Sequence, residues 1–253
     1  MRIRELTANL MKTFKHSGDM GDIVFSIPTV RALGGGVLYL DPDGGQESPV
    51  VSGMCIEAIN GEARARTKLN LDSINSLRPF LELQDGIQAV KTWERQSVDH
   101  DLDTFRYHDR FHNLCVSHLA AFGLSHDLAF GKWLTFPTKR QLPKPYVIAR
   151  SARYHGNYVW WAHTLRKIKD QVVFIGYPKE HEVFEYTFGY AVPYYPTPTI
   201  MDLVETINSC ERLLCNQGLP HAIAEGLSHP LVCEVFRPRP AAVFKGKPSS
   251  VYV

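Results

Sequence analysis

A glycine-rich segment near the start of the sequence carries two carboxylates where they could act on a hydroxyl group. Residues 18–22 read Gly-Asp-Met-Gly-Asp, between a predicted strand over 10–15 and a helical pattern over 23–33. A carboxylate in a tight loop after a strand projects into the crevice at the edge of a parallel sheet, where Asp22 can accept a proton. Asp22 can also cap the following helix, which the residues alone favour. Asp19 is a reserve base or a turn residue.

A second segment predicts a site for a phosphate. Residues 212–215 read as a strand, and 219–227 as a helix that starts directly after Gly218. Free N–H groups and the helix dipole at such a start attract a diphosphate. Gly218 permits close approach of the backbone, and His221 can donate to a phosphate oxygen. The alternative is an ordinary strand–helix turn with a structural histidine.

Two further charged residues follow predicted strands. Glu180 comes shortly after Gly176, and a carboxylate there accepts from ribose hydroxyls in other nucleotide-binding folds. Its alternative is a glutamate at a helix start. Arg153 follows a strand over 146–149 and offers a fork of donors to a phosphate, or else forms a surface ion pair.

Four potential metal ligands recur on one predicted helix over 107–122: His108, His112, Cys115 and His118. Zinc accepts such ligands, but one helix rarely closes a tetrahedral shell, so we predict no metal. We expect this polar stripe, together with Asp103 and Arg106 just before it, to face the cleft and meet the acceptor. A solvated helix face is the alternative.

The hydrophobic pattern alternates between strands and helices, which predicts an α/β protein with parallel sheets. Further strands are expected over 37–40, 87–93, 171–175 and 231–236, and further helices over 74–83, 160–168 and 199–209. Pro28 should start or kink the first helix. A proline-rich basic stretch, 136–145, is the best linker. The expected architecture is two Rossmann-like domains facing a cleft, 1–141 and 142–253.

The composition excludes several classes of protein. The chain has 253 residues, 44% hydrophobic and 21% charged, with a formal net charge of +2, so it is neither disordered nor a rod. No run of about 18 apolar residues could span a bilayer, and the first residues lack the apolar core of a secretion signal. The five cysteines form no C-x-x-C pair and predict reduced thiols in a cytoplasm. Residues 47–69 are a possible loop or lid, and 237–247 a solvated basic tail.

Two segments resemble one enzyme family. Residues 18–33, Gly-Asp-Met-Gly-Asp-Ile-Val-Phe-Ser-Ile-Pro-Thr-Val-Arg-Ala-Leu, are similar to the N-terminal motif of the bacterial ADP-heptose:lipopolysaccharide heptosyltransferases. Residues 202–230, which contain Asn-Gln-Gly-Leu-Pro-His, look like the family's donor-site motif. The resemblance implies a GT-B fold, with an acceptor-side N-terminal domain and a nucleotide-sugar-binding C-terminal domain.

The resemblance also assigns roles to residues. It makes Asp22 the catalytic base. The implied donor-binding residues are Gly21, Arg153, Glu180, Asn216, Gln217, Gly218, Leu219 and His221. The acceptor-side candidates are Asp19, Asp103, Arg106, His108 and His112. The chain is a short, divergent member by this comparison: Asn216 stands where the family usually has Asp, a lysine expected after Arg153 is absent, and the C-terminal crossing helix is expected to be missing or reduced.

The resulting prediction is an inverting, metal-independent glycosyltransferase that uses a nucleoside diphosphate sugar and no separate cofactor. The transferred sugar could be a hexose, heptose or pentose. The acceptor is a glycan hydroxyl or a hydroxymethylated base in DNA, which would have to be flipped out of the duplex. Two alternatives remain open: a non-catalytic nucleotide-sugar-binding module, and another α/β enzyme such as a nucleotide-sugar epimerase. The oligomeric state is left open.

Overall fold

The computed structural model describes residues 11–42, 69–108, 113–151, 153–238, 240 and 242–253. In chain order the elements are β1 (Lys12–His16), α1 (Met20–Ala32), β2 (Gly36–Leu40), α2 (Leu71–Leu81), β3 (Ile87–Thr92), β4 (His100–Asp101), η1 (Leu102–Tyr107), α3 (Leu114–Ala121), η2 (His126–Ala129), β5 (Tyr146–Ala149), α4 (Tyr158–Ile168), η3 (Lys169–Gln171), β6 (Val172–Phe174), α5 (Pro178–Phe188), α6 (Ile200–Ser209), β7 (Arg212–Asn216), α7 (Leu219–Leu227), β8 (Leu231–Glu234) and β9 (Ser250–Tyr252).

The strands form two separate parallel sheets, one in each half of the chain. The N-terminal sheet has the order β3-β2-β1-β4 and the C-terminal sheet the order β6-β5-β7-β8-β9. Within each sheet the strands run parallel, as strand–helix–strand units require. The predicted α/β class with two Rossmann-like halves is confirmed. The boundary between 141 and 142 stays a prediction.

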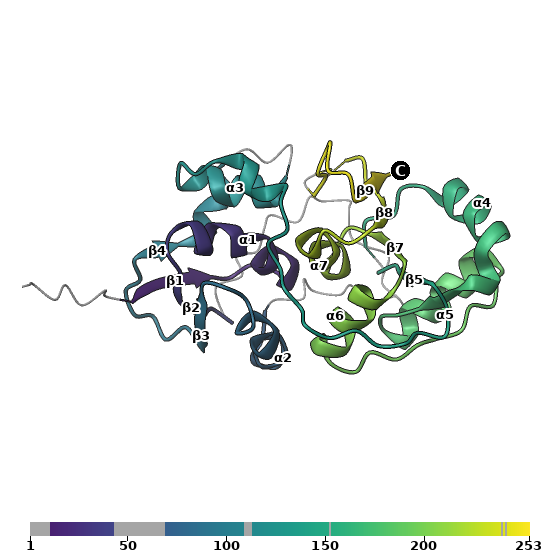
Figure 1. Cartoon of the computed structure of the whole chain (residues 1–253), viewed down its shortest axis with the longest axis horizontal. Coiled ribbons are helices and arrows are strands. Elements are labelled where there is room, and N and C mark those ends of the chain that lie inside the picture. Colours follow the sequence, from purple (N-terminus) through teal and green to yellow (C-terminus); the bar gives the residue numbers. More distant parts are fainter. Residues whose placement is uncertain (1–10, 43–68, 109–112, 152, 239, 241) are drawn as a thin grey trace, which may run out of the picture.

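Helix α1 lies at the centre of the molecule. It packs against α3 of its own half and against α7 of the other half, and Figure 1 shows α1 and α7 side by side between the two sheets. The residues from Ile23 to Val30 are all buried. The helix starts at Met20 and continues through Pro28, so the prediction that Pro28 starts it is wrong. Burial on several sides stabilises the helix enough to tolerate the missing hydrogen bond.

Two other predictions from the sequence are corrected. Residues 107–122 do not form one helix, because η1 ends at Tyr107 and α3 begins only at Leu114. The basic tail is solvated only in part: Arg237 and Lys245 are exposed, but Phe244 and Lys247 are buried, and β9 adds a strand to the C-terminal sheet. The possible lid over 47–69 falls, apart from Leu69, outside the described residues.

The connection between the sheets is packed rather than free. The backbone N–H groups of Trp133 and Leu134 both donate to the carbonyl of Gly226 in α7. The proline-rich stretch over 136–145 follows without regular structure, as predicted. Its Arg140 forms an ion pair with Asp202 of α6 at 3.0 Å. The two halves are therefore tied together along α7.

Candidate functional site

The loop after β1 holds a half-buried carboxylate at the start of α1. Asp22 is the third residue of the helix and accepts a hydrogen bond from the backbone N–H of Asp19. Burial, and after it the nearby carboxylate of Asp19, raises the pKa of Asp22 to about 7. A Cβ at Gly18 would lie 2.6 Å from His16 and 2.9 Å from the Asp22 carboxylate, so the tight turn requires glycine there. Asp22 is thus both a helix-capping residue and a carboxylate suited to proton transfer near neutral pH.

The start of α7 meets the start of α1. A Cβ at Gly21 would lie 3.7 Å from the carbonyl carbon of Gly218 and from the backbone nitrogen of Leu219. Leu219 is the first residue of α7, and its side chain packs against the core. The backbone N–H groups of Leu219 and His221 in this first turn are the kind of donors that anions bind, whereas Pro220 has no N–H. The carboxylate and the helix start that the sequence singled out separately are therefore neighbours.

Gly218 is not required by the protein's own packing. Its backbone is extended, with φ at 168°, a conformation that any residue adopts. A Cβ there would approach only the Pro220 ring, at 3.9 Å. By contrast, a Cβ at Gly226 on the same helix would overlap the side chains of Leu134 and Trp133. The absence of a side chain at 218 thus leaves space beside the helix start that the described residues do not fill.

Asn216 shapes the neighbouring loop rather than presenting a free amide. Its Oδ1 accepts from the backbone N–H of Ser151 at 3.0 Å, and its Nδ2 donates to the carbonyls of Ser151 and Arg153. Arg153, held by this loop, reaches across to the other half and pairs with Asp19 at 3.3 Å. The Arg153 guanidinium thereby lies at the start of α1. Direct contact of Asn216 with a donor stays a prediction.

The remaining donor-side candidates have partners within the protein. Glu180 accepts from the backbone N–H of Tyr177 at 3.1 Å and forms a capping box at the start of α5, which is the alternative considered for it. Gln217 accepts from the backbone N–H of Phe236 at 2.8 Å. Neither contact involves the loop of Asp22. Their contact with a nucleotide stays a prediction.

The architecture can be compared with known proteins at this point. No family model and no curated protein sequence matches the chain. Among solved structures, a glycosyl transferase family 9 protein from Veillonella parvula matches with a TM-score of 0.58 and 9% identity, over 95% of this chain and 84% of that one. The E. coli heptosyltransferase WaaC with ADP matches with a TM-score of 0.54 and 10% identity, over 95% and 92%. WaaC with ADP-2-deoxy-2-fluoro heptose gives 0.51 and 9%, over the same shares.

The chain has a GT-B fold. At this level of identity the likeness concerns the fold alone, and it places the meeting point of α1 and α7 between the two halves of a GT-B architecture. After Leu227 the described residues hold β8 and β9 but no helix. Among the residues described, none of the helices combines the length and apolarity that a bilayer-spanning segment needs.

His221 is part of the core of this GT-B fold, not of an open cleft wall. It is fully buried, its ring lies edge-on to Phe25 with centroids 6.0 Å apart, and its Nε2 is 3.4 Å from the Tyr252 hydroxyl and 3.6 Å from Glu225. Its Nδ1 has no hydrogen-bond partner among the described residues. From the sequence we expected His221 to donate to a phosphate oxygen. Of its two ring nitrogens, only Nδ1 is without a partner among the described residues and could take that role.

The C-terminal segment over 242–252 completes this cluster. Tyr252 donates to Glu225 at 2.5 Å, and Lys247 lies 3.4 Å from the other carboxylate oxygen. Lys247 also donates to the carbonyl of Gly131 in the N-terminal half, at 3.3 Å. Although burial opposes ionisation of Glu225, its hydrogen bonds keep the pKa of that carboxyl below its ordinary value. His221, Glu225, Lys247 and Tyr252 are called the C-terminal histidine cluster below.

Asp103 of the acceptor-side group holds the end of β1. It accepts from the backbone N–H and the hydroxyl of Ser17, at 3.0 and 2.7 Å, and pairs with Lys15 at 3.0 Å and with Arg106. Although burial alone would raise it, the neighbouring His16 and the hydrogen bonds from Ser17 and Arg106 hold the pKa of Asp103 well below its ordinary value. Asp103 and Arg106 therefore lie beside the Gly18 turn; that they face a cleft and meet an acceptor stays a prediction. His108 is half-buried just before the undescribed residues, and His112 falls outside the described residues.

Among the described residues, the part of the expected polar stripe that lies in α3 is not exposed. Cys115 and His118 lie in α3 but are fully buried. His118 Nε2 is 3.0 Å from Nε2 of His16, a contact the sequence analysis missed. Within the described part of the chain, no three His, Cys, Asp or Glu side chains gather as a metal site requires. Helix α3 is short and packs against α1. The side chains on its inner face, Cys115 and His118 among them, are therefore buried.

A buried ion pair supports the donor-side loop and was also missed. Arg150, at the end of β5, pairs with Glu234 of β8 at 2.8 Å. Glu234 further accepts from the Trp161 indole at 2.8 Å and from the N–H groups of Gly156 and Asn157 at 2.6 and 2.7 Å. The signal was a glutamate inside an apolar strand pattern, which indicates a paired buried charge. This pair fixes the start of α4 and the loop that carries Arg153.

Proposed function

We propose that the protein is an inverting, metal-independent glycosyltransferase that moves a sugar from a nucleoside diphosphate sugar to an acceptor hydroxyl. One observation carries the proposal: Gly21, the residue before Asp22, lies against Gly218 and Leu219 at the start of α7, so the Asp22 loop and the proposed diphosphate site are neighbours. The GT-B fold supports glycosyl transfer in general. The ADP and ADP-sugar in the WaaC structures support a purine diphosphate donor.

In the proposed reaction the acceptor hydroxyl attacks the anomeric carbon of the donor sugar. Asp22 takes the hydroxyl proton, the new C–O bond forms, and the bond to the diphosphate oxygen breaks with its electron pair on that oxygen. Attack opposite to the leaving group inverts the anomeric centre. A base is most useful when its pKa is near the working pH, which matches the pKa of about 7 at Asp22.

The departing diphosphate gains negative charge as the bond breaks. The first-turn amides of α7 and the helix dipole can stabilise that charge without a metal ion. Arg153 adds a guanidinium, which suits phosphate oxygens better than an ammonium does. Binding of phosphate there would exchange the Asp19 partner of Arg153 for a stronger one. Charge stabilisation in this proposal comes from the protein alone.

The deciding experiment compares Asp22→Asn with the unmodified protein on a panel of nucleoside diphosphate sugars and glycan acceptors, with product detected by mass spectrometry. We expect the variant to lose about 10²–10⁴-fold in rate. The unmodified enzyme should gain activity as pH rises through about 7, because Asp22 must lose its proton to act as a base. Asp19→Asn is the matched control: it lowers the pKa of Asp22, so the rising limb moves to lower pH while transfer persists.

Stability provides an independent check that Asp22→Asn folds. The folded state keeps the Asp22 proton up to about pH 7, whereas an unfolded chain releases it near its ordinary pKa of 3.8. The native state therefore loses stability as pH rises between these values, and asparagine removes that loss. We expect the variant to unfold at equal or higher urea concentration at pH 8. A variant that is folded and fully active would refute the role of Asp22.

A binding module without transfer is the second candidate, favoured by the engagement of Asn216 with the loop carbonyls. It predicts a thermal shift with a nucleoside diphosphate but no product with any acceptor. A hydroxymethylated DNA base remains a possible acceptor from the sequence analysis, and mass spectrometry of such DNA after incubation tests it. The glycan hydroxyl is the acceptor we propose.

A further inference from the structure

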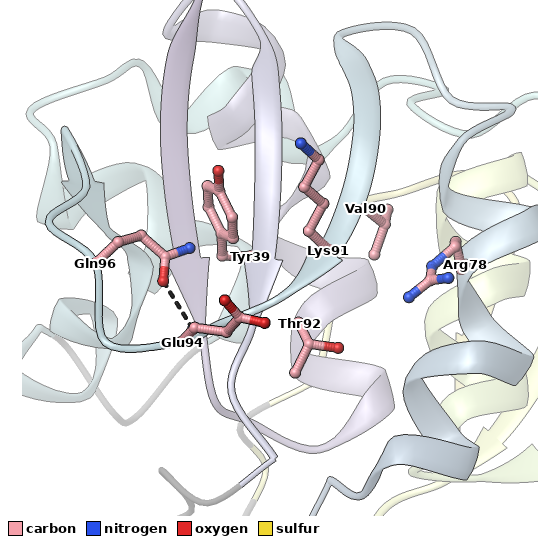
Figure 2. Close-up of a pocket in the computed structure, with 7 residues that line it drawn as sticks. All are labelled: Tyr39, Arg78, Val90, Lys91, Thr92, Glu94 and Gln96. Atoms are coloured by element: carbon pink, nitrogen blue, oxygen red, sulfur yellow. Dashed lines mark hydrogen bonds between the residues drawn. The ribbon is translucent and has the colours of Figure 1, made fainter.

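The N-terminal sheet carries an open pocket of about 600 Å³ at its β3 edge. Its lining comes from β2, β3, the end of α2 and the turn after β3, and consists of Tyr39, Arg78, Val90, Lys91, Thr92, Glu94 and Gln96 (Figure 2). The volume lies within the range of about 300–1,000 Å³ typical of ligand sites. None of the lining residues belongs to the Asp22 loop or to the start of α7. The pocket is therefore separate from the proposed transfer site.

One polar group that lines this pocket has no hydrogen-bond partner among the described residues, whereas Gln96 Oε1 already accepts from the backbone N–H of Glu94 at 2.7 Å. The Nε of Arg78 is buried without a hydrogen bond. Among the described residues, neither Lys91 nor Glu94 forms an ion pair, and both line the pocket. A buried donor without an acceptor is unfavourable, and a ligand oxygen that reached it would relieve that cost. The pocket therefore lacks an acceptor for Arg78.

The backbone explains how these groups come together. Tyr39 and Lys91 are register partners on β2 and β3, so their side chains project from the same face of the sheet. In Figure 2 the Arg78 side chain points from α2 toward Thr92, and Glu94 lies between Tyr39 and Thr92. Glu82 accepts from the Val90 N–H at 2.9 Å and so covers the edge of β3. A ligand here would meet side chains rather than a free strand edge.

We propose that this pocket binds a saccharide that carries a phosphate or carboxylate group. Arg78 supplies the cation for the anionic group and can hold it with two donors. Lys91 also lines the pocket but projects from the opposite face of β3, so it adds a second positive charge nearby rather than a second direct contact. Glu94, Gln96, Thr92 and the Tyr39 hydroxyl supply acceptors and donors, which match sugar hydroxyls. A nucleic-acid strand presents a row of phosphates and fits less well, because Glu94 would repel it. This site does not depend on the proposed transfer reaction.

The test is isothermal titration calorimetry with glucose 6-phosphate, glucuronate, neutral glucose, inorganic phosphate and a short oligonucleotide. We expect glucose 6-phosphate or glucuronate, or both, to bind more tightly than neutral glucose and inorganic phosphate. Comparison of these two sugars shows whether the pocket prefers a phosphate or a carboxylate group. Arg78→Gln should weaken that binding about tenfold or more, and Lys91→Gln several-fold. Arg166→Gln and Lys167→Gln remove the same charges from exposed positions of α4 and should leave it unchanged.

Several outcomes would overturn the proposal. These are no binding of either acidic sugar, equal affinity for inorganic phosphate, tighter binding of the oligonucleotide, or binding unaffected by Arg78→Gln in a variant with an unchanged melting temperature. Binding should also persist in Asp22→Asn. That result separates this site from the transfer reaction, since a failure of transfer alone would leave the pocket's binding intact.

Discussion

Two buried histidine sites flank the central helix α1, and they are completed in different ways. On the α3 side, His16 and His118 satisfy each other: the Gly18 N–H donates to His16 Nδ1 at 2.8 Å, His16 Nε2 faces His118 Nε2, and His118 Nδ1 donates to the Leu114 carbonyl at 2.7 Å. On the α7 side, the C-terminal histidine cluster leaves Nδ1 of His221 and one oxygen of Glu225 without a hydrogen bond among the described residues.

The difference in hydrogen bonding separates a structural pair from a cluster that lies beside the proposed binding site. All four nitrogens of the His16–His118 pair are used with both rings neutral, so this pair needs nothing from outside and holds the Gly18 turn in place. The C-terminal histidine cluster holds a charged pair and keeps hydrogen-bonding capacity unused beside the helix start proposed to bind diphosphate. Buried polar groups that remain unsatisfied cost stability and mark places where function explains them.

The largest effect is expected from Glu225→Ala. The change leaves the Lys247 ammonium buried without its carboxylate, which costs about 3–5 kcal/mol. Urea unfolding should show the loss. The double variant Glu225→Gln and Lys247→Met removes both charges and should recover much of it. If Glu225→Ala unfolds at the urea midpoint of the unmodified protein, the cluster is not a stabilising unit and the comparison fails.

The His16–His118 pair should make the stability of the folded protein depend on pH in the acid range. Burial lowers the pKa of His16 to about 4, while an unfolded chain takes up a proton near 6.5. The unfolded state therefore binds more protons between these values, and the native state loses about 3 kcal/mol as pH falls from 6.5 to 4. Unfolding measured at several pH values tests this.

His229 is the control for that acid response, because burial also lowers its pKa to about 4. The variant His229→Gln removes the contribution of His229 to the loss of stability in acid. The contribution of His16 should remain. Ring carbon shifts measured by NMR should report neutral His16 and His118 at pH 5. A charged His16 at that pH would contradict the tautomers assigned above.

Two glycines, Gly218 at the N-cap of α7 and Gly226 within it, allow a structural role to be compared with a binding role. Gly226→Ala forces a methyl group into Leu134 and Trp133 and should cost about 1–3 kcal/mol. Gly218→Ala has room, so its free energy of unfolding should change by less than about 1 kcal/mol. It should nevertheless weaken nucleoside diphosphate binding. Urea unfolding and calorimetry with ADP measure the two effects; unchanged ADP affinity in Gly218→Ala would argue against the phosphate site.

The smallest stability effect is expected from Arg153→Gln. Its ion pair with Asp19 is about one-third exposed on both sides, and such pairs contribute roughly 0–1 kcal/mol. Diphosphate affinity should fall more clearly than stability, because the proposal uses this guanidinium as a partner for phosphate oxygens. A loss of stability without a change in affinity would make Arg153 part of the scaffold.

Local patterns carried most of the element predictions. The helix over 219–227 agrees at both ends, and the strands at β2, β3 and β5 agree within a residue or two, since alternation and turn residues act over a few positions. The prediction of one helix over 107–122 was wrong, since the backbone is extended at His108 and Asn113 between η1 and α3. The polar residues of α3 were expected on an open face but are buried. The tail over 237–247 was wrong because charge indicated solvent, while Lys247 finds a buried carboxylate far away in the sequence.

The sequence alone determined the α/β alternation, the Gly-Asp-Met-Gly-Asp turn and the glycine before α7, because each depends on residues close together in the chain. Only the tertiary structure decided that Gly21 meets Gly218, that His16 pairs with His118, and that β2, β3 and α2 enclose a polar pocket. The reason is that contacts between distant segments depend on how two sheets pack around one helix, and no local pattern encodes that packing.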